Sequence, residues 1–194
     1  MRIGIYVFDE VEVLDFAGPF EIFSTAGRLQ ERAGVDDGAR LSPSLISIEP
    51  TVTARGGLVV KPRWLLRLAP RLDLLIVPGG IVDAELKNEL AIEFIRVHAD
   101  SAPIASVCTG AFLLAEAGLL AGKRATTHWA DLDTFAARYP AVTVERDLRF
   151  VDEGEIVTSA GVAAGIEMSL HLVERYAGRM IAEQTAKLSE VAMP

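Results

Sequence analysis

Short apolar runs alternate with amphipathic stretches along the whole chain. The apolar runs have the length of β-strands and the near-continuous hydrophobicity of strands that are covered on both faces. They are residues 3–8, 41–48, 71–77, 102–107 and 156–159. Stretches with helical periodicity lie between them, and this alternation predicts an α/β fold with a mostly parallel central sheet. We expect a flavodoxin-like three-layer sandwich, and a single domain of residues 1–194.

Shorter segments complete the expected layout. The helices after the first one are residues 83–99, 111–115, 131–139, 166–176 and 178–190. The remaining short strands are residues 125–127, 142–145 and 149–152, and a small hairpin is expected at residues 51–60. In the helix at 83–99, the residues available for burial are Leu86, Leu90, Ile92, Phe94 and Ile95. Residues 31–40 are polar and contain glycine, which is typical of an exposed loop.

The first helix is expected to carry Pro19 in its first turn, because proline loses no helical hydrogen bond there. The residues expected on its buried side are Phe20, Ile22, Phe23 and Ala26. That boundary leaves Asp15 in the connection just beyond the first strand. A carboxylate between two apolar residues is either a helix cap or a polar group placed for chemistry, and a cap or turn is the commoner role of a single Asp.

Composition narrows the class of protein. Hydrophobic residues make up 51% of the chain, which supports a large core, yet no apolar run is long enough to span a bilayer. The net charge of −8 argues against direct binding to nucleic acid, and three His residues without clustered spacing do not make a zinc site. One Cys excludes an intrachain disulfide and, with a start that lacks a signal-peptide pattern, indicates the cytoplasm. We expect a small-molecule substrate.

The single cysteine, Cys108, lies between the apolar run at residues 102–107 and the helix that follows. Ser106 and Gly110 flank it, and small residues there permit a sharp strand-to-helix turn like the nucleophile elbow of hydrolases. A thiol at such a turn faces the positive end of the next helix, which favours the thiolate. A lone cysteine can also be an inert core residue, but this context favours a reactive thiol with a sparsely populated backbone conformation.

Several polar or flexible positions follow predicted strands. They are Asp15, the Gly79–Gly80 pair, Cys108 and His128. Ligands of open parallel sheets bind outside the carboxyl ends of the strands, so these residues are expected on one edge. The N–H groups of Gly79 and Gly80 are then available to an anion, although Pro-Gly-Gly is by itself also a plain tight turn. The convergence of these positions indicates a site more strongly than any one of them.

Four motifs resemble the DJ-1/PfpI superfamily, in the same order and over nearly the whole chain. They are Val-Pro-Gly-Gly at 77–80, Ser-Val-Cys-Thr-Gly-Ala at 106–111, the segment ending in Thr-Thr-His-Trp at 117–129, and Thr-Ser-Ala-Gly-Val-Ala-Ala-Gly-Ile at 158–166. Two branches are most similar. One is isocyanide (isonitrile) hydratase, through Leu-Asp-x-x-Gly-Pro at 14–19 and Cys-Thr-Gly at 108–110. The other is the amidotransferase-like domain of AraC-type regulators, whose helix-turn-helix module is not expected in this chain.

Departures from the superfamily pattern change the expected chemistry. Thr109 stands where PfpI-type proteases have a His, which argues against peptidase activity. Asp15 stands where many DJ-1 relatives have a Glu, and the shorter acid is found in the hydratase and in the regulator domains. His128 matches a position near the cysteine, where a histidine more often forms structural hydrogen bonds than acts as a base. We include it among the residues that border the substrate.

The resemblance implies nucleophilic hydration of an isonitrile. Cys108 as thiolate would attack the terminal carbon, and water would open the resulting thioimidate to an N-substituted formamide. Asp15, protonated beside the thiolate, would deliver and accept protons. Thr109 would contribute its hydroxyl and N–H, and Gly79 and Gly80 would stabilise developing charge. No metal or organic cofactor is expected, and the resemblance implies a two-fold homodimer.

A ligand- or redox-sensing domain without turnover is the alternative, because an accessible thiol of low pKa also suits an oxidant sensor. The length of the chain favours an enzyme, whereas residues 146–164 are most similar to the regulator branch. Both hypotheses keep Cys108 and Asp15, so the sequence leaves them open.

Overall fold

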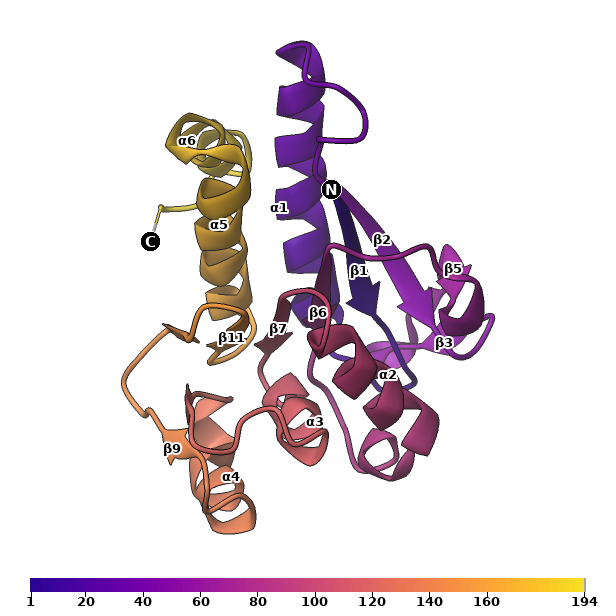
Figure 1. Cartoon of the computed structure of the whole chain (residues 1–194), viewed down its shortest axis with the longest axis vertical. Coiled ribbons are helices and arrows are strands. Elements are labelled where there is room, and N and C mark those ends of the chain that lie inside the picture. Colours follow the sequence, from indigo (N-terminus) through magenta and orange to yellow (C-terminus); the bar gives the residue numbers. More distant parts are fainter. Residues whose placement is uncertain (194) are drawn as a thin grey trace.

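A central sheet of seven strands runs through the computed structural model, which describes residues 1–193 (Figure 1). The strand order is β10-β11-β7-β6-β1-β2-β5, and every neighbouring pair is parallel except β10 and β11. The strands are β1 (Arg2–Tyr6), β2 (Ser42–Ser47), β5 (Trp64–Leu65), β6 (Leu74–Val77), β7 (Ile104–Val107), β10 (Phe150–Asp152) and β11 (Ile156–Ser159). The predicted α/β fold with a mostly parallel sheet is confirmed.

Helices cover both faces of this sheet. The helices are α1 (Val13–Arg32), α2 (Glu89–Ala99), α3 (Gly110–Glu116), α5 (Ala163–Ala177) and α6 (Arg179–Leu188), and α4 (Leu132–Arg138) lies beside β9 (Thr143–Val144), away from the central sheet. Parallel connections are right-handed, and the step from β1 to β2 runs along the sheet in the opposite direction from the step from β6 to β7. Helices α1 and α2 consequently lie on opposite faces. Helix α1 packs against α5 and α6, and α2 packs against α3, which completes the three layers (Figure 1).

The middle strands are buried on both faces because they lie between these helical layers. All four residues of β6 and all four of β7 are buried, and Ile3 and Ile5 of β1 have no exposed surface. This burial explains why their sequences are almost continuously apolar. The loops that follow β6 and β7 begin from this rigid base, and they carry Gly79 and Cys108.

Helix α1 begins earlier than the sequence predicts. It starts at Val13, so Pro19 lies inside it and Asp15 lies in its first turn rather than in the preceding connection. A hydrogen bond to the loop after β6 holds the chain just before the helix, because the N–H of Glu12 donates to the Gly79 carbonyl at 2.9 Å. Helix α1 begins directly after this hydrogen bond, at Val13. Pro19 has no N–H, so the helix lacks one backbone hydrogen bond at that position and continues through it.

Two predicted strands lie outside the central sheet. Strands β8 (Arg124–Ala125) and β9 (Thr143–Val144) pair with each other, so His128 follows a strand of a separate two-stranded sheet.

The predicted hairpin at residues 51–60 is confirmed as β3 (Val52–Thr53) and β4 (Val59–Val60). Edge strand β5 has two residues and is too short to leave a periodic pattern in the sequence.

The helix expected at residues 83–99 begins later, at Glu89. Three residues spaced by three or four positions form its buried side, and they are Ala91, Ile95 and His98. Leu90 lies one position outside this stripe and is 69% exposed, so its expected burial is wrong.

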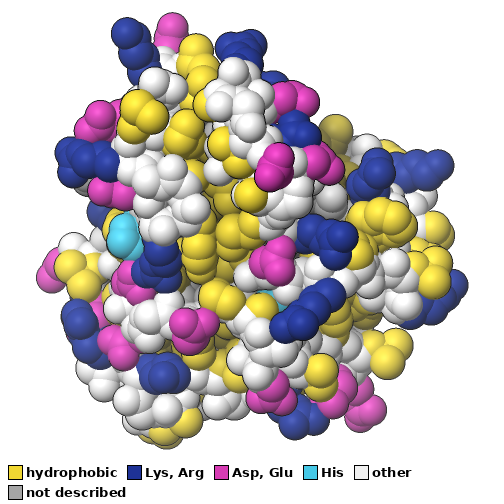
Figure 2. Space-filling view, turned by 45° about the horizontal axis from the view of Figure 1, so that its top comes forward, with side chains coloured by type: hydrophobic (Ala, Val, Ile, Leu, Met, Phe, Trp, Pro, Cys, Tyr) yellow, Lys and Arg dark blue, Asp and Glu magenta, His cyan; other side chains and the backbone are white. Residues whose placement is uncertain are grey.

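Acidic and basic side chains are interspersed on the face shown in Figure 2, and hydrophobic side chains gather in a hollow between them. Proteins that bind the phosphates of nucleic acids usually cluster Lys and Arg on one surface, and this mixture of signs differs from that pattern. Within residues 1–193, no helix combines the length and the hydrophobicity that crossing a bilayer requires.

We expect Gly110→Ala to destabilise the fold at the start of α3. A Cβ at this position would stand 2.1 Å from the carbonyl oxygen of Val77 and 2.8 Å from that of Pro78, and both are backbone atoms with little freedom to move. Overpacking of this kind costs about 3 kcal/mol of unfolding free energy. Urea unfolding measures the change, with Gly38→Ala as the control, because a Cβ on Gly38 has no neighbour within 4 Å. A Gly110→Ala protein of wild-type stability would contradict this close packing.

Candidate functional site

The turn between β7 and α3 holds Cys108 in a left-handed backbone conformation, with φ of 58°. This conformation is uncommon for residues other than glycine. Two hydrogen bonds maintain it: the Cys108 N–H donates to the Ser159 carbonyl at 3.0 Å, and the Thr127 hydroxyl donates to the Cys108 carbonyl at 2.8 Å. The predicted strand-to-helix elbow is confirmed, and backbone strain of this kind is typical of functional sites.

Asp15 is brought to the cysteine by the first turn of α1, and it is completely buried. Its Oδ2 accepts a hydrogen bond from the Gly79 N–H at 3.2 Å. Its Oδ1 makes no hydrogen bond of ordinary geometry within residues 1–193. The carboxyl is therefore directed at Gly79 and Cys108 instead of capping the helix that carries it.

Burial raises the pKa values of both members of this pair. Burial raises the pKa of Asp15 from 3.8 to about 6, while the Gly79 N–H and the nearby Cys108 thiol counteract part of the rise. Burial, followed by the negative charge of Asp15, raises the pKa of Cys108 from 9.0 to about 12, and the Thr109 N–H opposes that rise. Burial and the charge on Asp15 therefore favour a protonated sulfur beside the carboxylate.

The sequence predicted the opposite distribution, a Cys108 thiolate beside a protonated Asp15. Burial of the sulfur opposes that distribution, which relied on the positive end of the following helix to lower the pKa of the thiol. Helix α3 has seven residues, and the Thr109 N–H at its start does not offset the burial of the sulfur. The carboxylate is thus placed where it can accept the proton of the thiol.

The Gly79–Gly80 turn supports the side chains of Asp15 and Thr109. The Gly79 N–H is engaged with Asp15, and the Gly80 N–H donates to the Thr109 hydroxyl at 2.9 Å. Both N–H groups are therefore occupied within the protein, so their predicted role in stabilising charge on a substrate is corrected to a positioning role. Glycine is required at position 80, since a Cβ there would stand 2.2 Å from the Glu10 carbonyl oxygen.

Thr109 contributes to the site mainly through its backbone. Its hydroxyl also donates to the Gly80 carbonyl at 2.9 Å, so this group is committed to the turn on both sides. Its N–H lies close enough to the Cys108 sulfur to lower the pKa of the thiol. Of the predicted site residues, Thr109 supplies the N–H that can stabilise negative charge on the sulfur.

His128 lies beside the site, and its hydrogen bonds are made elsewhere. Its Nδ1 accepts from the Ala130 N–H at 3.4 Å and lies 3.4 Å from Oδ2 of Asp131. These contacts agree with the structural role expected for it. A Cβ on Gly161 would lie 3.0 Å from Cδ2 of His128 and 3.6 Å from the Cys108 sulfur, so both groups border the same glycine.

Gly161 and Val162, in the loop between β11 and α5, complete the site, and the sequence assigned no role to them. Gly161 has φ of 143° and adjoins the Cys108 sulfur, while the N–H of Val162 helps to lower the pKa of Asp15. A signal for them existed in the sequence. They follow the buried strand at 156–159, and in the sheet this strand is the neighbour of the one that leads to Cys108.

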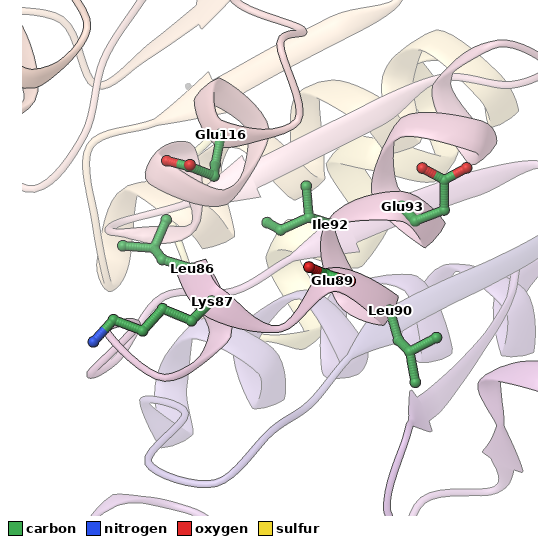
Figure 3. Close-up of a pocket in the computed structure, with 7 residues that line it drawn as sticks. All are labelled: Leu86, Lys87, Glu89, Leu90, Ile92, Glu93 and Glu116. Carbon is green, nitrogen blue, oxygen red and sulfur yellow. The ribbon is translucent and has the colours of Figure 1, made fainter.

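Two hollows in the surface differ in how their lining relates to the cysteine. One of about 670 Å³ lies beside α2 and α3, where Glu93 and Glu116 point in different directions and are held by Arg96 and Arg138 (Figure 3). Its carboxylates do not converge, and residues 1–193 hold no group of three or more His, Cys, Asp or Glu arranged for a metal ion. The other hollow, of about 400 Å³, is lined by Gly161, which adjoins the Cys108 sulfur.

A model of the DJ-1/PfpI family matches residues 1–175. The chain belongs to the DJ-1/PfpI family. It is 36% identical over 180 residues to the isonitrile hydratase of Pseudomonas putida. The aligned region covers 92% of this chain and 73% of that protein. It is 33% identical over 137 residues to the HTH-type transcriptional regulator CdhR of Pseudomonas aeruginosa. This aligned region covers 70% of this chain and 40% of the regulator. A crystal structure of a ThiJ/PfpI family protein from Pseudomonas syringae has a TM-score of 0.82 and 28% identity, and covers 97% of this chain and 74% of that chain.

We expect Asp15→Asn to lower the pKa of Cys108, because the substitution removes a negative charge that opposes the thiolate. The rate at which iodoacetamide alkylates the single cysteine, followed from neutral to alkaline pH, measures this shift. The wild-type rate should keep rising toward pH 12, and the variant should react faster at each lower pH. Asp37→Asn removes an exposed carboxylate and is the control. A thiol that titrates at higher pH in Asp15→Asn would instead mean that a protonated Asp15 stabilises the thiolate.

Proposed function

We propose that this protein hydrates isonitriles to N-substituted formamides, with Cys108 as the nucleophile. The observation that carries the proposal is the buried Asp15 carboxylate directed at a cysteine on a strained elbow. A nucleophile next to its own proton acceptor is the arrangement that covalent catalysis requires. The similarity to the isonitrile hydratase of Pseudomonas putida supports this choice of reaction.

The first step forms a bond between the Cys108 sulfur and the terminal carbon of the isonitrile, while the thiol proton passes to Asp15. Asp15 then delivers this proton to the same carbon, which gives a thioimidate with an N=CH–S linkage and restores the carboxylate. The Thr109 N–H stabilises the negative charge that develops on the sulfur as its proton leaves. A carboxyl with a pKa of about 6 can both accept and return a proton near neutral pH.

The second step consumes one water molecule. Asp15 takes a proton from water as the water oxygen bonds to the thioimidate carbon, and it passes this proton to the nitrogen, which leaves a hydroxyl group on the carbon. The carbon–sulfur bond then breaks as this hydroxyl becomes the formamide carbonyl. The hydroxyl proton passes through Asp15 to the sulfur, and an N-substituted formamide leaves. Isonitrile and water are consumed and formamide is formed, so the reaction needs no oxidant, reductant or cofactor.

A ligand-sensing domain related to AraC-type regulators is the second candidate function. The similarity to the regulator CdhR over 70% of this chain favours it. Sensing of oxidants is less well supported, because burial raises the pKa of Cys108 and leaves little thiolate to react.

Formamide production from benzyl isonitrile by the purified protein tests the proposed reaction. We expect Cys108→Ala to abolish turnover and Asp15→Asn to lower kcat by about a hundredfold or more, the usual scale of general acid–base catalysis. Asp37→Asn, with its exposed carboxylate, should remain fully active. Full activity of Asp15→Asn would disprove the role of the carboxylate, and a wild type that binds but does not hydrate isonitriles would favour the sensing domain.

We also propose that the protein is a two-fold homodimer with one Cys108 site in each subunit. Large apolar side chains remain exposed on its helices, and they include Leu90, Met180 and Leu188. Pairing of such surfaces would remove them from water. Light scattering should give the mass of a dimer across micromolar concentrations. A monomer throughout that range would contradict this assembly and would leave the chemistry at Cys108 unaffected.

A further inference from the structure

An exposed indole lines the hollow beside Gly161. Trp129 and Leu148 form part of the wall of this space of about 400 Å³. Trp129 is 77% exposed and Leu148 is 40% exposed. Leaving so much apolar surface in contact with water is unfavourable, and aromatic side chains in a hollow typically stack on the apolar part of a ligand.

Gly161 adjoins both the hollow and the nucleophile. It lies in the wall of the hollow, and a Cβ at this position would stand 3.6 Å from the Cys108 sulfur. The same Cβ would stand 3.0 Å from Cδ2 of His128, so a side chain on residue 161 would crowd the gap between the sulfur and this ring. His128 in turn adjoins Trp129, with 5.4 Å between their ring centroids. A substrate whose reactive carbon reaches Cys108 can thus extend its other end past His128 toward Trp129.

Both arginines that line this hollow are paired with carboxylates. Arg149 forms two hydrogen bonds with the Glu167 carboxylate, at 2.9 and 2.6 Å, and Arg146 forms an ion pair with Asp133 at 2.7 Å. Asp147 adds a further negative charge to the lining. With both arginines engaged, an anionic group on the substrate gains little here, and a neutral apolar group suits the wall better.

We propose, on the basis of hydration at Cys108, that Trp129 and Leu148 bind the N-substituent of the substrate and select isonitriles with a neutral aromatic or cyclic apolar group. Methyl isonitrile is too short to reach this wall, whereas benzyl isonitrile places a ring against the indole. Trp129 is then a specificity-determining residue that takes no part in proton transfer.

Comparison of the two isonitriles tests the selectivity. In Trp129→Ala, kcat/KM for benzyl isonitrile should fall about tenfold, while that for methyl isonitrile stays within about twofold. Trp64→Phe is the control, because Trp64 belongs to β5 at the far edge of the sheet, and it should leave both values unchanged. An equal fall for both isonitriles, or no fall, would overturn the proposal.

Binding can also be measured without turnover. Trp64 and Trp129 are the two tryptophans of the chain, so Trp64→Phe leaves Trp129 as the single indole. Titration of this variant with N-benzylformamide should change its fluorescence in a saturable manner, and N-methylformamide at the same concentrations should not. An emission that responds to protein concentration and not to N-benzylformamide would place Trp129 in a contact between copies, and would overturn the proposal.

The two measurements separate this inference from the proposed reaction. If the protein hydrates isonitriles but Trp129→Ala has no effect and the fluorescence does not respond, the role of Trp129 is disproved and the proposed reaction stands. Saturable binding of N-benzylformamide without hydration of either isonitrile disproves the reaction and supports an apolar binding site at Trp129.

Discussion

A buried carboxyl beside a buried thiol is the constraint on which the site depends. Asp15 has no exposed surface, and its Oδ1 makes no ordinary hydrogen bond within residues 1–193. Since its pKa rises from 3.8 to about 6, the folded protein binds this proton more tightly than the unfolded chain does. Compared with neutral pH, the fold is therefore more stable below about pH 4, and this extra stability is lost as the pH rises through about 6. At neutral pH the ionised carboxyl costs the fold about 3 kcal/mol.

Close backbone contacts hold this pair in place. Asp15 and Cys108 come from different elements, α1 and the β7–α3 turn, and the loop after β6 lies between them and contacts both. A Cβ on Gly79 would stand 2.6 Å from the Thr109 nitrogen and 2.9 Å from Cβ of Cys108, so the loop and the elbow interlock without room for a side chain. The geometry of the site therefore follows from the positions of β1, β6 and β7 in the middle of the sheet, since these strands set where the three segments begin.

The sequence predicted best what depends on residues close together in the chain. The middle strands are almost continuously apolar, and small residues around Cys108 predicted its elbow. The start of α1 depends instead on a hydrogen bond between Glu12 and Gly79, which are distant in sequence, so Pro19 alone gave the wrong boundary. The direction of the Gly79 N–H and the pKa of Cys108 likewise depend on burial and on neighbours that the folded chain assembles. The sequence brings the right residues together but does not reveal their protonation.

The protonation of the pair bears on whether such a site turns over or senses. An oxidant reacts with a standing thiolate, and a thiol with a pKa of about 12 provides very little of it at neutral pH. In the proposed reaction the Asp15 carboxylate, with a pKa of about 6, accepts the proton while the sulfur attacks and can then return it. Cys108 would then become nucleophilic only when an electrophile is held beside it, next to Gly161. Binding of the ligand, more than the acidity of the free thiol, then determines which molecules react.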